Sequence, residues 1–309
     1  MVKNSRQEPL FVPFLFSALE ELDPELLQSV AIMIWDYEDI ALQEMIVSQS
    51  DLIIAAASDQ TIEQIDKVIR NTRPSARFHR HGHKVSFTTI GKKFLTMHES
   101  LGTNPPNSLF EETAMLAALD SILWDQNGCL SSRIHFVEQG DQNHFSPLDY
   151  ANQLVDSMRI LGSKLPRGNT TLSSIHDRFD HFNAQAVSPQ LTLCSSYEDD
   201  FIVVLDQRPW NARQFASIVN TCMDRTVVIR PIGSLLDVPN QYLSHLSPNN
   251  LQTMYVAIDS NSHTTRSEEF SQFVEKTGKL GITSIRTVGQ SPFPQLAYSW
   301  DGYLPHSLA

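Results

Sequence analysis

Short apolar runs alternate with helical patterns along the whole chain, and this alternation is the feature that most restricts the fold. The runs are rich in β-branched residues, have the length of single strands, and lie at 52–56, 85–90, 133–137, 201–205, 226–230, 254–258 and 282–285. Segments with apolar residues at helical spacing lie between several of them. Strands that alternate with helices typically form a parallel sheet, because each helix returns the chain to start the next strand in the same direction. We therefore predict an α/β fold with largely parallel sheets.

Polar residues at helix starts support the helical segments. Ser108 and Glu111 have the spacing of a capping box, and the helix that they open runs directly into the segment around Cys129. Another helix is predicted from about Pro147 to Leu161, and a polar stretch follows to about residue 198. The tail from 289 to 309 is rich in Pro, Ser and aromatic residues and is predicted to be extended.

The charge balance and the cysteines restrict the partners and the compartment. The chain of 309 residues has a net charge of −12, and it has no Lys/Arg stripe to bind nucleic acid or an anionic membrane. No apolar stretch reaches the roughly 18 residues that a membrane-spanning helix needs. Cys129, Cys194 and Cys222 are widely spaced and form no CxxC pair. We therefore expect a cytoplasmic protein that binds no nucleic acid and spans no membrane.

Cys129 lies on a connection between a predicted helix and a predicted strand. The preceding residues, Asn127 and Gly128, allow a tight turn and a close approach of the backbone. Backbone N–H groups beside such a cysteine can lower the pKa of its thiol or hold an oxyanion, and a thiolate suits acyl transfer because it attacks and departs readily. The alternative is a buried structural cysteine, which is the usual fate of a free thiol. Spacing alone favours this alternative.

Two further segments have both a functional and a structural interpretation. The run 52–56, the turn around Ser58 and the helix after it have the form of a phosphate cradle, in which a helix N-terminus attracts an anion. The turn contains no glycine, and Ser58 is more simply a helix cap. His79, His81 and His83 alternate along an extended segment and point to one side, as in a metal site. No carboxylate or thiolate is close in the sequence, so ordinary histidines are favoured and no metal is predicted.

The run AALDSILWDQNGCLSS, at 117–132, resembles the helix and nucleophile signature of the acyl-CoA reductases typified by the fatty-acid reductase of bacterial bioluminescence. That family belongs to the aldehyde dehydrogenase superfamily. The resemblance extends along most of the chain, and it reverses the interpretation of Cys129, which it identifies as the nucleophile. It implies an aldehyde-dehydrogenase-like α/β fold with a partial Rossmann-type cofactor domain and an α/β catalytic domain. The implied boundaries are 1–97 for the remainder of the cofactor domain, 98–288 for the catalytic domain and 289–309 for a C-terminal tail.

The resemblance also implies the reaction and the cofactor residues. Cys129 would attack an acyl thioester, and the acyl-enzyme would accept a hydride from a nicotinamide cofactor, which in this family is NADPH, to give an aldehyde. The segment 2–5 is similar to the superfamily's Lys-Pro-Ser strand end, where Lys3 and Ser5 would approach the adenosine ribose. The turn that ends in Ser58 matches the turn at the cofactor phosphates, so Ser58 is the residue expected to contact them.

Three departures from the family pattern bear on function. The segment 81–84 stands where many aldehyde dehydrogenases have Glu-Leu-Gly-Gly-Lys, and the absence of the water-activating glutamate favours reduction over oxidation. Ala57 replaces the glycine of the phosphate turn, and its methyl group is expected to crowd a pyrophosphate. Lys3 matches a position well inside the family's cofactor domain. The first strands, the acyl tunnel and the asparagine that usually donates to the oxyanion therefore have no counterpart in these residues.

The expected substrate is an acyl-CoA or an acyl group on a carrier protein, and acyl-transferase or synthetase subunits are the expected protein partners. A homo-oligomer is also compatible with the sequence. Two other functions stay open. One is a truncated, catalytically impaired paralogue that binds related reductase or acyl-transferase subunits. The other is a CoA-acylating aldehyde dehydrogenase that works mainly toward oxidation.

Overall fold

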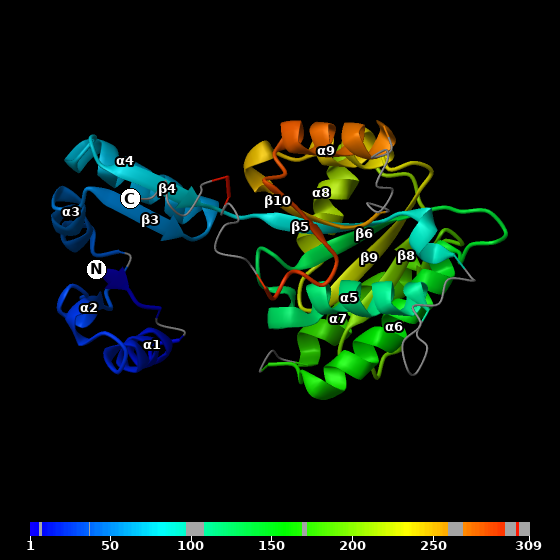
Figure 1. Ribbon diagram of the computed structural model, residues 1–309, viewed down its shortest axis with the longest axis horizontal. Helices are drawn as coiled ribbons and strands as arrows, with labels where there is room; N and C mark the ends of the chain where they lie inside the picture. The colour runs from blue at the N-terminus through cyan, green and yellow to red at the C-terminus, as the bar shows by residue number, and fades with distance from the viewer. Residues whose placement is uncertain are drawn as a thin grey trace. The chain divides into compact units, whose positions relative to one another are not determined.

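The computed structural model describes residues 1–5, 8–36, 38–96, 108–168, 172–258, 268–293 and 301–302. The chain divides into two compact units, Met1–His81 and Gly82–Ala309, and Figure 1 colours the first from blue to cyan and the second from cyan to red. Most strand pairs in both units are parallel, and helices separate many of the strands along the chain. The predicted α/β class is therefore confirmed.

The first unit is built from short pairs of parallel strands with helices between them. Strand β1 (Val2–Lys3) pairs with β2 (Ile32–Met33), and β3 (Leu52–Ala56) pairs with β4 (Arg77–His81). The helices are α1 (Phe11–Glu20), α2 (Pro24–Gln28), α3 (Ile40–Ser48) and α4 (Asp59–Thr72). Large apolar side chains on and beside α1 are exposed, among them Leu10, Phe14 and Leu22.

The second unit folds around a sheet whose described strands run in the order β11-β10-β5-β6-β9-β8-β7. These strands are β5 (Val85–Ile90), β6 (Ser132–Glu138), β7 (Leu191–Leu193), β8 (Ile202–Asp206), β9 (Thr226–Ile232), β10 (Leu251–Ala257) and β11 (Ser284–Thr287). The pairs are parallel except β7 with β8, which is antiparallel. Six of the seven apolar runs named above therefore coincide with or overlap strands of this sheet.

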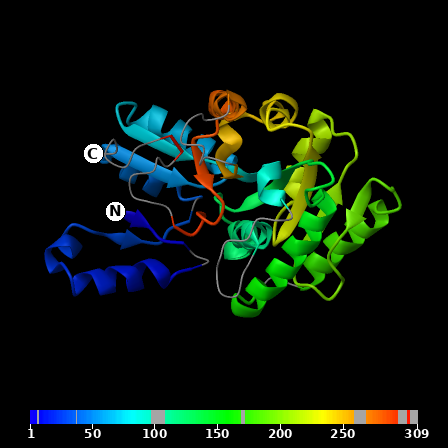
Figure 2. The ribbon, with the colours of Figure 1, turned by 45° about the vertical axis from the view of Figure 1, so that its right-hand side comes forward.

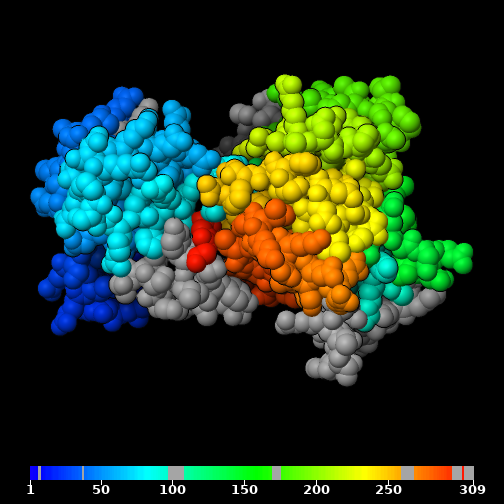
Figure 3. Space-filling view, turned by 90° about the horizontal axis from the view of Figure 1, so that it is seen from above, coloured from blue at the N-terminus to red at the C-terminus, as the bar shows by residue number. Residues whose placement is uncertain are grey.

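Helices cover both faces of the sheet. They are α5 (Leu109–Ile122), α6 (Pro147–Lys164), α7 (Leu172–Gln185), α8 (Ala212–Thr221) and α9 (Glu268–Leu280). Helices α8 and α9 lie on one face, and α5 and α6 lie on the other (Figure 1 and Figure 2). Phe136 and Val137 follow each other on β6 and belong to the cores on opposite faces, as the alternation of a strand requires. Helix α9 lies at the surface of its face (Figure 3).

Several connections form short helical turns, and some elements were not predicted, among them α1 and α3 in the first unit and α7 and β7 in the second. The turns are η1 (Lys92–Leu95), η2 (Leu123–Gln126), η3 (Val238–Tyr242), η4 (Leu243–His245) and η5 (Pro248–Asn250). Helix α7 and strand β7 lie in the stretch that the sequence marks only as polar. No helix within the described residues is long and apolar enough to cross a membrane.

The two units divide between His81 and Gly82, whereas the sequence places the domain boundary after residue 97. The segment between these positions contains β5, whose residues are all buried. Strand β5 pairs with β6 on one side and with β10 on the other, so it belongs to the middle of the larger sheet. The roles of the two units in cofactor binding and catalysis stay predictions. Of the tail 289–309, the structure describes residues 289–293 and 301–302.

Candidate active site

Cys129 lies between η2 and β6, at the end of the sheet where β5, β6, β9 and β10 begin. Helix α5 leads into this connection, and the predicted capping box at its start is confirmed. The Glu111 backbone N–H donates to Ser108 Oγ at 3.2 Å, and the Ser108 backbone N–H donates to the Glu111 carboxylate at 3.0 Å. Helix α5 is therefore capped at its start, and its C-terminal end leads into the loop that contains Cys129.

The three residues of η2 that precede the cysteine loop adopt a left-handed backbone conformation. Trp124, Asp125 and Gln126 have φ values of 55°, 50° and 62°. Such values are uncommon for residues other than glycine. Each costs of order 1 kcal/mol or more, so it persists only where contacts with the surroundings compensate for this cost. The turn is therefore a strained segment next to Cys129, and the contacts of its side chains must fix it.

Gln126 fixes the turn from inside the protein. Its side chain is fully buried, and its Nε2 donates to the Ser132 carbonyl oxygen at 2.8 Å. Its Oε1 accepts from the Thr226 backbone N–H, also at 2.8 Å. The side chain thus joins the starts of β6 and β9, and an amide is required because one bond uses a donor and the other an acceptor.

Asp125 fixes the turn through a buried arginine. Arg225 is 2% exposed, and its Nε donates to Asp125 Oδ1 at 2.7 Å. The same guanidinium donates to Asp200 Oδ2 at 3.0 Å and to the Leu165 carbonyl oxygen at 2.8 Å. Asp125 also accepts the Gly168 backbone N–H at 2.9 Å. A charge-assisted network therefore ties the strained turn to the end of α6 and the start of β9.

The main chain around Cys129 is held by side chains from two neighbouring strands. Ser86 Oγ on β5 donates to the Cys129 carbonyl oxygen at 2.7 Å. Tyr255 Oη on β10 donates to the Leu130 carbonyl oxygen at 2.8 Å. As a residue Cys129 is exposed, whereas Cys194 is half-buried and Cys222 is buried. The description of a buried structural cysteine therefore fits Cys222 and not Cys129.

The surroundings of Cys129 favour the protonated thiol. Although the side chain reaches the surface, nearby protein atoms remove part of its solvation, and this desolvation raises the pKa of the thiol above its ordinary value. A hydrogen bond from the Gln252 side chain lowers the thiol pKa, and the negative charge of Asp301 raises it. The described residues therefore do not supply a thiolate at neutral pH by themselves, and nucleophilic attack needs a proton acceptor.

Asp120, on α5, anchors the turn that follows β11. Its Oδ2 accepts the Gly289 backbone N–H at 2.6 Å, and its Oδ1 accepts the Ser291 backbone N–H at 2.8 Å. Burial raises the pKa of this carboxyl to about 7, although both backbone bonds and the nearby Arg286 lower it. Asp120 was not singled out from the sequence, because an acid at a buried helix position carries no local signal of its partner more than a hundred residues away.

The raised pKa of Asp120 makes a pH-dependent contribution to stability. The folded state keeps the proton that the unfolded carboxyl loses near pH 4, so this contribution is lost as the pH rises toward 7. His135 acts in the opposite sense, because burial lowers its pKa to about 3. We therefore compare the unfolding free energies of Asp120→Asn and the wild type. We expect the difference between them to move in favour of the variant by about 2 kcal/mol as the pH rises from 5 to 8. Urea unfolding of both proteins across this range checks the result, and a constant difference between them would refute it.

The predicted cofactor residues lie in the first unit and are held by different strand pairs. The Lys3 ammonium lies 4.9 Å from the centre of the Trp35 ring, beyond the end of β2. Ser5 follows β1, and its backbone N–H donates to Asn4 Oδ1 at 3.0 Å. Ser58 caps α4, accepting the Thr61 backbone N–H at 3.3 Å. The capping interpretation of Ser58 is therefore observed, and cofactor contacts of all three residues stay a prediction.

The surroundings of Lys3 and those of Ser58, called here the Lys3 end and the Ser58 end, differ in how well they fit a dinucleotide. At the Lys3 end, a cation and an aromatic ring stand together, and the buried indole N–H of Trp35 has no hydrogen-bond partner among the described residues. These groups fit a ribose hydroxyl or phosphate beside an aromatic base. At the Ser58 end, the hydroxyl is already engaged and Asp59 adds a negative charge to the first turn of α4. The Lys3 end is therefore the better fit.

Two of the three alternating histidines are interior, and His83 is exposed. His79 and His81 lie on β4 and are 9% and 5% exposed. Within the described part of the chain, no group of three or more His, Cys, Asp or Glu side chains has the arrangement of a metal site.

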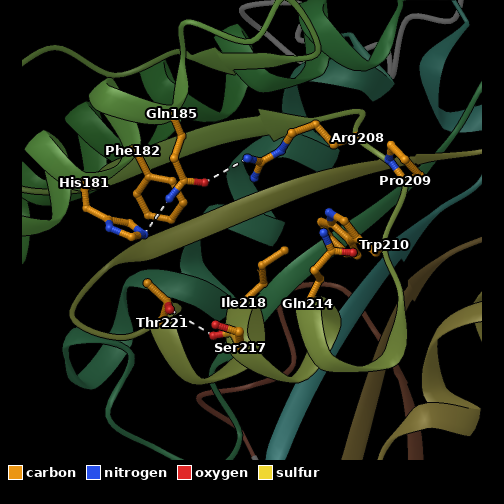
Figure 4. A pocket seen from close by; sticks show the side chains of 10 residues that line it. All are labelled: His181, Phe182, Gln185, Arg208, Pro209, Trp210, Gln214, Ser217, Ile218 and Thr221. Carbon is orange, nitrogen blue, oxygen red and sulfur yellow. Dashed lines mark hydrogen bonds between the residues drawn. The ribbon is translucent and has the colours of Figure 1, made fainter.

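A separate cavity of about 200 Å³ lies between α7, α8 and the loop after β8 (Figure 4). Its polar groups are largely paired with each other: Arg208 donates to Gln185 Oε1 at 2.8 Å and to both oxygens of Asp206. Trp210 and Ile218 supply apolar surface. Cys129 is not among the lining residues, so the cavity is distinct from the cysteine loop.

Solved structures show which fold this is. The aldehyde dehydrogenase KauB from Pseudomonas aeruginosa matches with a TM-score of 0.56 and 8% identity, over 90% of this chain and 54% of that chain. An indole-3-acetaldehyde dehydrogenase in complex with NAD⁺ matches with a TM-score of 0.55 and 8% identity, again over 90% and 54%. The predicted aldehyde-dehydrogenase-like fold is therefore confirmed.

Sequence relatives show the family. The long-chain acyl-protein thioester reductase of Aliivibrio fischeri is 22% identical over 295 residues, which make up 94% of this chain and 54% of that protein. The chain thus spans about half the length of this curated relative. The family model of the acyl-CoA reductases (LuxC) matches residues 1–306, almost the entire sequence. The chain therefore belongs to the acyl-CoA reductase (LuxC) family.

Proposed function

We propose that this protein takes part in the NADPH-dependent reduction of a long-chain acyl thioester to an aldehyde, through an acyl group carried on Cys129. The observation that carries the proposal is the position of Cys129, an exposed residue on a loop that hydrogen bonds of buried side chains hold in place. Family membership supports the reaction class. The name of the Aliivibrio fischeri relative supports an acyl donor bound to a protein as an alternative to acyl-CoA.

The reaction divides into two steps at one sulfur atom. In the first, the Cys129 thiolate forms a bond to the acyl carbon, the carbon–sulfur bond to the carrier breaks, and the proton lost by Cys129 ends on the carrier thiol. In the second, a hydride reaches the acyl carbon, the bond to Sγ breaks, and the aldehyde leaves while Cys129 takes up a proton. A nicotinamide cofactor, when bound, would supply the hydride. Two moderate barriers thus replace one high barrier.

The cofactor proposal rests on the first unit. Lys3 and Ser5 would bind the adenosine ribose and its phosphate, and Ser58 would contact the pyrophosphate. The pairing of Lys3 with Trp35 supports the first of these roles. The NAD⁺ complex of the indole-3-acetaldehyde dehydrogenase, which shares the fold, supports a nicotinamide cofactor in general.

Replacing Lys3 tests the cofactor proposal. We expect Lys3→Met to weaken NADPH binding about tenfold, because a charge-assisted contact to a phosphate is lost. Quenching of Trp35 fluorescence during an NADPH titration gives the Kd, and a Trp35→Phe variant confirms which emission changes. Lys67→Met, at an exposed position on α4, serves as the matched control and should bind as the wild type does. Equal Kd values for Lys3→Met and the control would rule out the assigned role of Lys3.

The function is tested by following both half-reactions. The full chain is incubated with a long-chain acyl-CoA, with and without NADPH, and the released thiol, the aldehyde and the oxidised cofactor are measured. We expect thiol release without NADPH, and aldehyde with an equal amount of NADP⁺ when NADPH is added. Faster conversion of aldehyde, CoA and NADP⁺ to acyl-CoA would instead identify a CoA-acylating aldehyde dehydrogenase.

The second candidate function is binding to a related reductase, transferase or synthetase subunit. The observation in its favour is the exposed apolar surface on and beside α1 in the first unit. A protein of this kind would be folded, would release no thiol from acyl-CoA, and would elute with such a subunit in size-exclusion chromatography. Thiol release by the isolated chain would argue against this candidate.

A further inference from the structure

Two buried hydroxyl groups hold consecutive carbonyl oxygens of the loop that contains Cys129. The Cys129 carbonyl oxygen accepts from Ser86 Oγ at 2.7 Å, and the Leu130 carbonyl oxygen accepts from Tyr255 Oη at 2.8 Å. Ser86 and Tyr255 are both fully buried, and they lie on different strands, β5 and β10. The two peptide groups that follow the cysteine are therefore each held by a separate element of the sheet.

These bonds fix the direction of both peptide groups. In a trans peptide the N–H lies opposite the carbonyl oxygen, so an oxygen that is held inside the protein directs the N–H the other way. The Ser131 N–H belongs to the second of these groups, and it donates to the Gly128 carbonyl oxygen at 3.0 Å. This bond closes a β-turn over 128–131 with Cys129 as its second residue. The orientation of the turn is therefore set by side chains outside it.

The contact of Tyr255 with this turn depends on the length of its side chain. Tyr255 pairs with Thr88 on β5, and Thr88 pairs with His135 on β6. Leu130 precedes the first residue of β6, whereas His135 lies in the middle of that strand. Only a long side chain can therefore reach back from position 255 to the Leu130 carbonyl oxygen. Burial raises the pKa of the Tyr255 hydroxyl, so this group keeps its proton and can donate.

We propose that Ser86 and Tyr255 are positioning residues for the nucleophile, which fix the turn at 128–131 so that Cys129 meets the acyl carbon in one orientation. The inference rests on the proposed role of Cys129. Attack on an acyl carbon requires a narrow range of approach, and a misplacement of about 1 Å can slow such a step about a hundredfold. Loss of either hydroxyl is therefore expected to slow acyl transfer without weakening the binding of the acyl donor.

A purely structural role of these hydroxyls predicts a different result, and the chain offers two matched controls for it. Thr89 lies on β5, is fully buried, and donates to Met254 Sδ at 3.1 Å. Tyr150 lies on α6, is fully buried, and its Oη is 2.9 Å from His135 Nδ1. Neither bond involves the turn at 128–131. Thr89→Val and Tyr150→Phe therefore each remove a buried hydroxyl that does not hold the turn.

The test compares Ser86→Ala and Tyr255→Phe with these controls and with the wild type. Single-turnover release of CoA from a long-chain acyl-CoA, without NADPH, gives the rate at saturation and the half-saturating concentration. We expect Ser86→Ala and Tyr255→Phe to release CoA about tenfold more slowly at saturation, with an unchanged half-saturating concentration. The controls should keep the wild-type rate. Urea unfolding checks that every variant is folded under the assay conditions.

Alkylation of Cys129 by iodoacetamide separates orientation from ionisation. The rate is read from the Cys129 peptide by mass spectrometry, which distinguishes it from the other two cysteines. A small reagent can approach the sulfur from many directions, so its rate reports mainly the thiolate fraction and access. We expect Ser86→Ala and Tyr255→Phe to be alkylated within about twofold of the wild-type rate, with the same dependence on pH.

Release of CoA by Ser86→Ala and Tyr255→Phe at the wild-type rate would overturn the inference. An equal loss in the controls would also overturn it, and so would an alkylation rate that falls in parallel with acyl transfer. A folded wild type that is alkylated at Cys129 but releases no CoA would instead refute the proposed function, and the positioning role would fall with it. The two failures are therefore distinguishable.

Discussion

Cys129→Ser is expected to lower the rate of thiol release from acyl-CoA at least about a thousandfold, because a serine hydroxyl ionises far less readily than a thiol and the described loop contains no base to activate it. The loop itself should stay intact. The contacts that hold it are made by the Cys129 main chain and by neighbouring side chains, such as Ser86 Oγ to the Cys129 carbonyl oxygen. The measurement is single-turnover release of CoA with a thiol reagent, at saturating acyl-CoA.

Cys194→Ser provides the control for this substitution. Cys194 is half-buried, and its Sγ donates weakly to the Thr192 carbonyl oxygen on β7, at the edge of the sheet. It should release CoA at the wild-type rate. A Cys129→Ser variant that keeps more than about a tenth of that rate would show that another group accepts the acyl chain.

Arg225→Met is expected to destabilise the second unit by about 3 kcal/mol, because it leaves the Asp125 and Asp200 carboxylates without their buried partner. Arg225 is 2% exposed and donates to both of these carboxylates and to the Leu165 carbonyl oxygen. Residue 225 has a φ of 62° in the wild type. Methionine faces a similar backbone strain, so the difference in unfolding free energy reports mainly the side chain. Urea unfolding at pH 7 measures it.

Lys279→Met is the matched control for Arg225→Met. Lys279 pairs with Glu275 one turn earlier on α9, and both side chains are more than half exposed. Such a pair contributes about 0.5 kcal/mol or less. If Arg225→Met cost no more than this control, the arginine would not hold the turn at 124–126, and the left-handed turn would need another cause.

The strands and helices of the second unit could be largely predicted, because their patterns are local. The run 226–230 is apolar and β-branched and lies within β9, and Ser108 with Glu111 marks the start of α5. Helix α7 and strand β7 could not be predicted in the same way. The buried residues that α7 contributes to the core, such as Ile175 and Phe182, stand among polar neighbours, and β7 spans only Leu191–Leu193. The place of β5 in the larger sheet depends on pairing with strands that come later in the chain.

The geometry around Cys129 could not be predicted from the sequence, for a similar reason. The left-handed turn at 124–126 has no glycine that would indicate it in the sequence. The groups that hold this turn lie about a hundred residues later, at Arg225 and Thr226. Tyr255, which holds the Leu130 carbonyl oxygen, is likewise distant from Cys129 in sequence. Cys129 itself was identified through family resemblance, since spacing alone favoured a structural cysteine.

The central claim is that Cys129 carries the acyl group. Its most direct test is mass spectrometry of the intact chain and its peptides after incubation with a long-chain acyl-CoA in the absence of NADPH. We expect the Cys129 peptide to gain the mass of one acyl group, to lose it on treatment with hydroxylamine, and to lose it as aldehyde when NADPH is added. Folded protein with an unmodified Cys129 peptide, or an acyl group found at another residue, would contradict the claim.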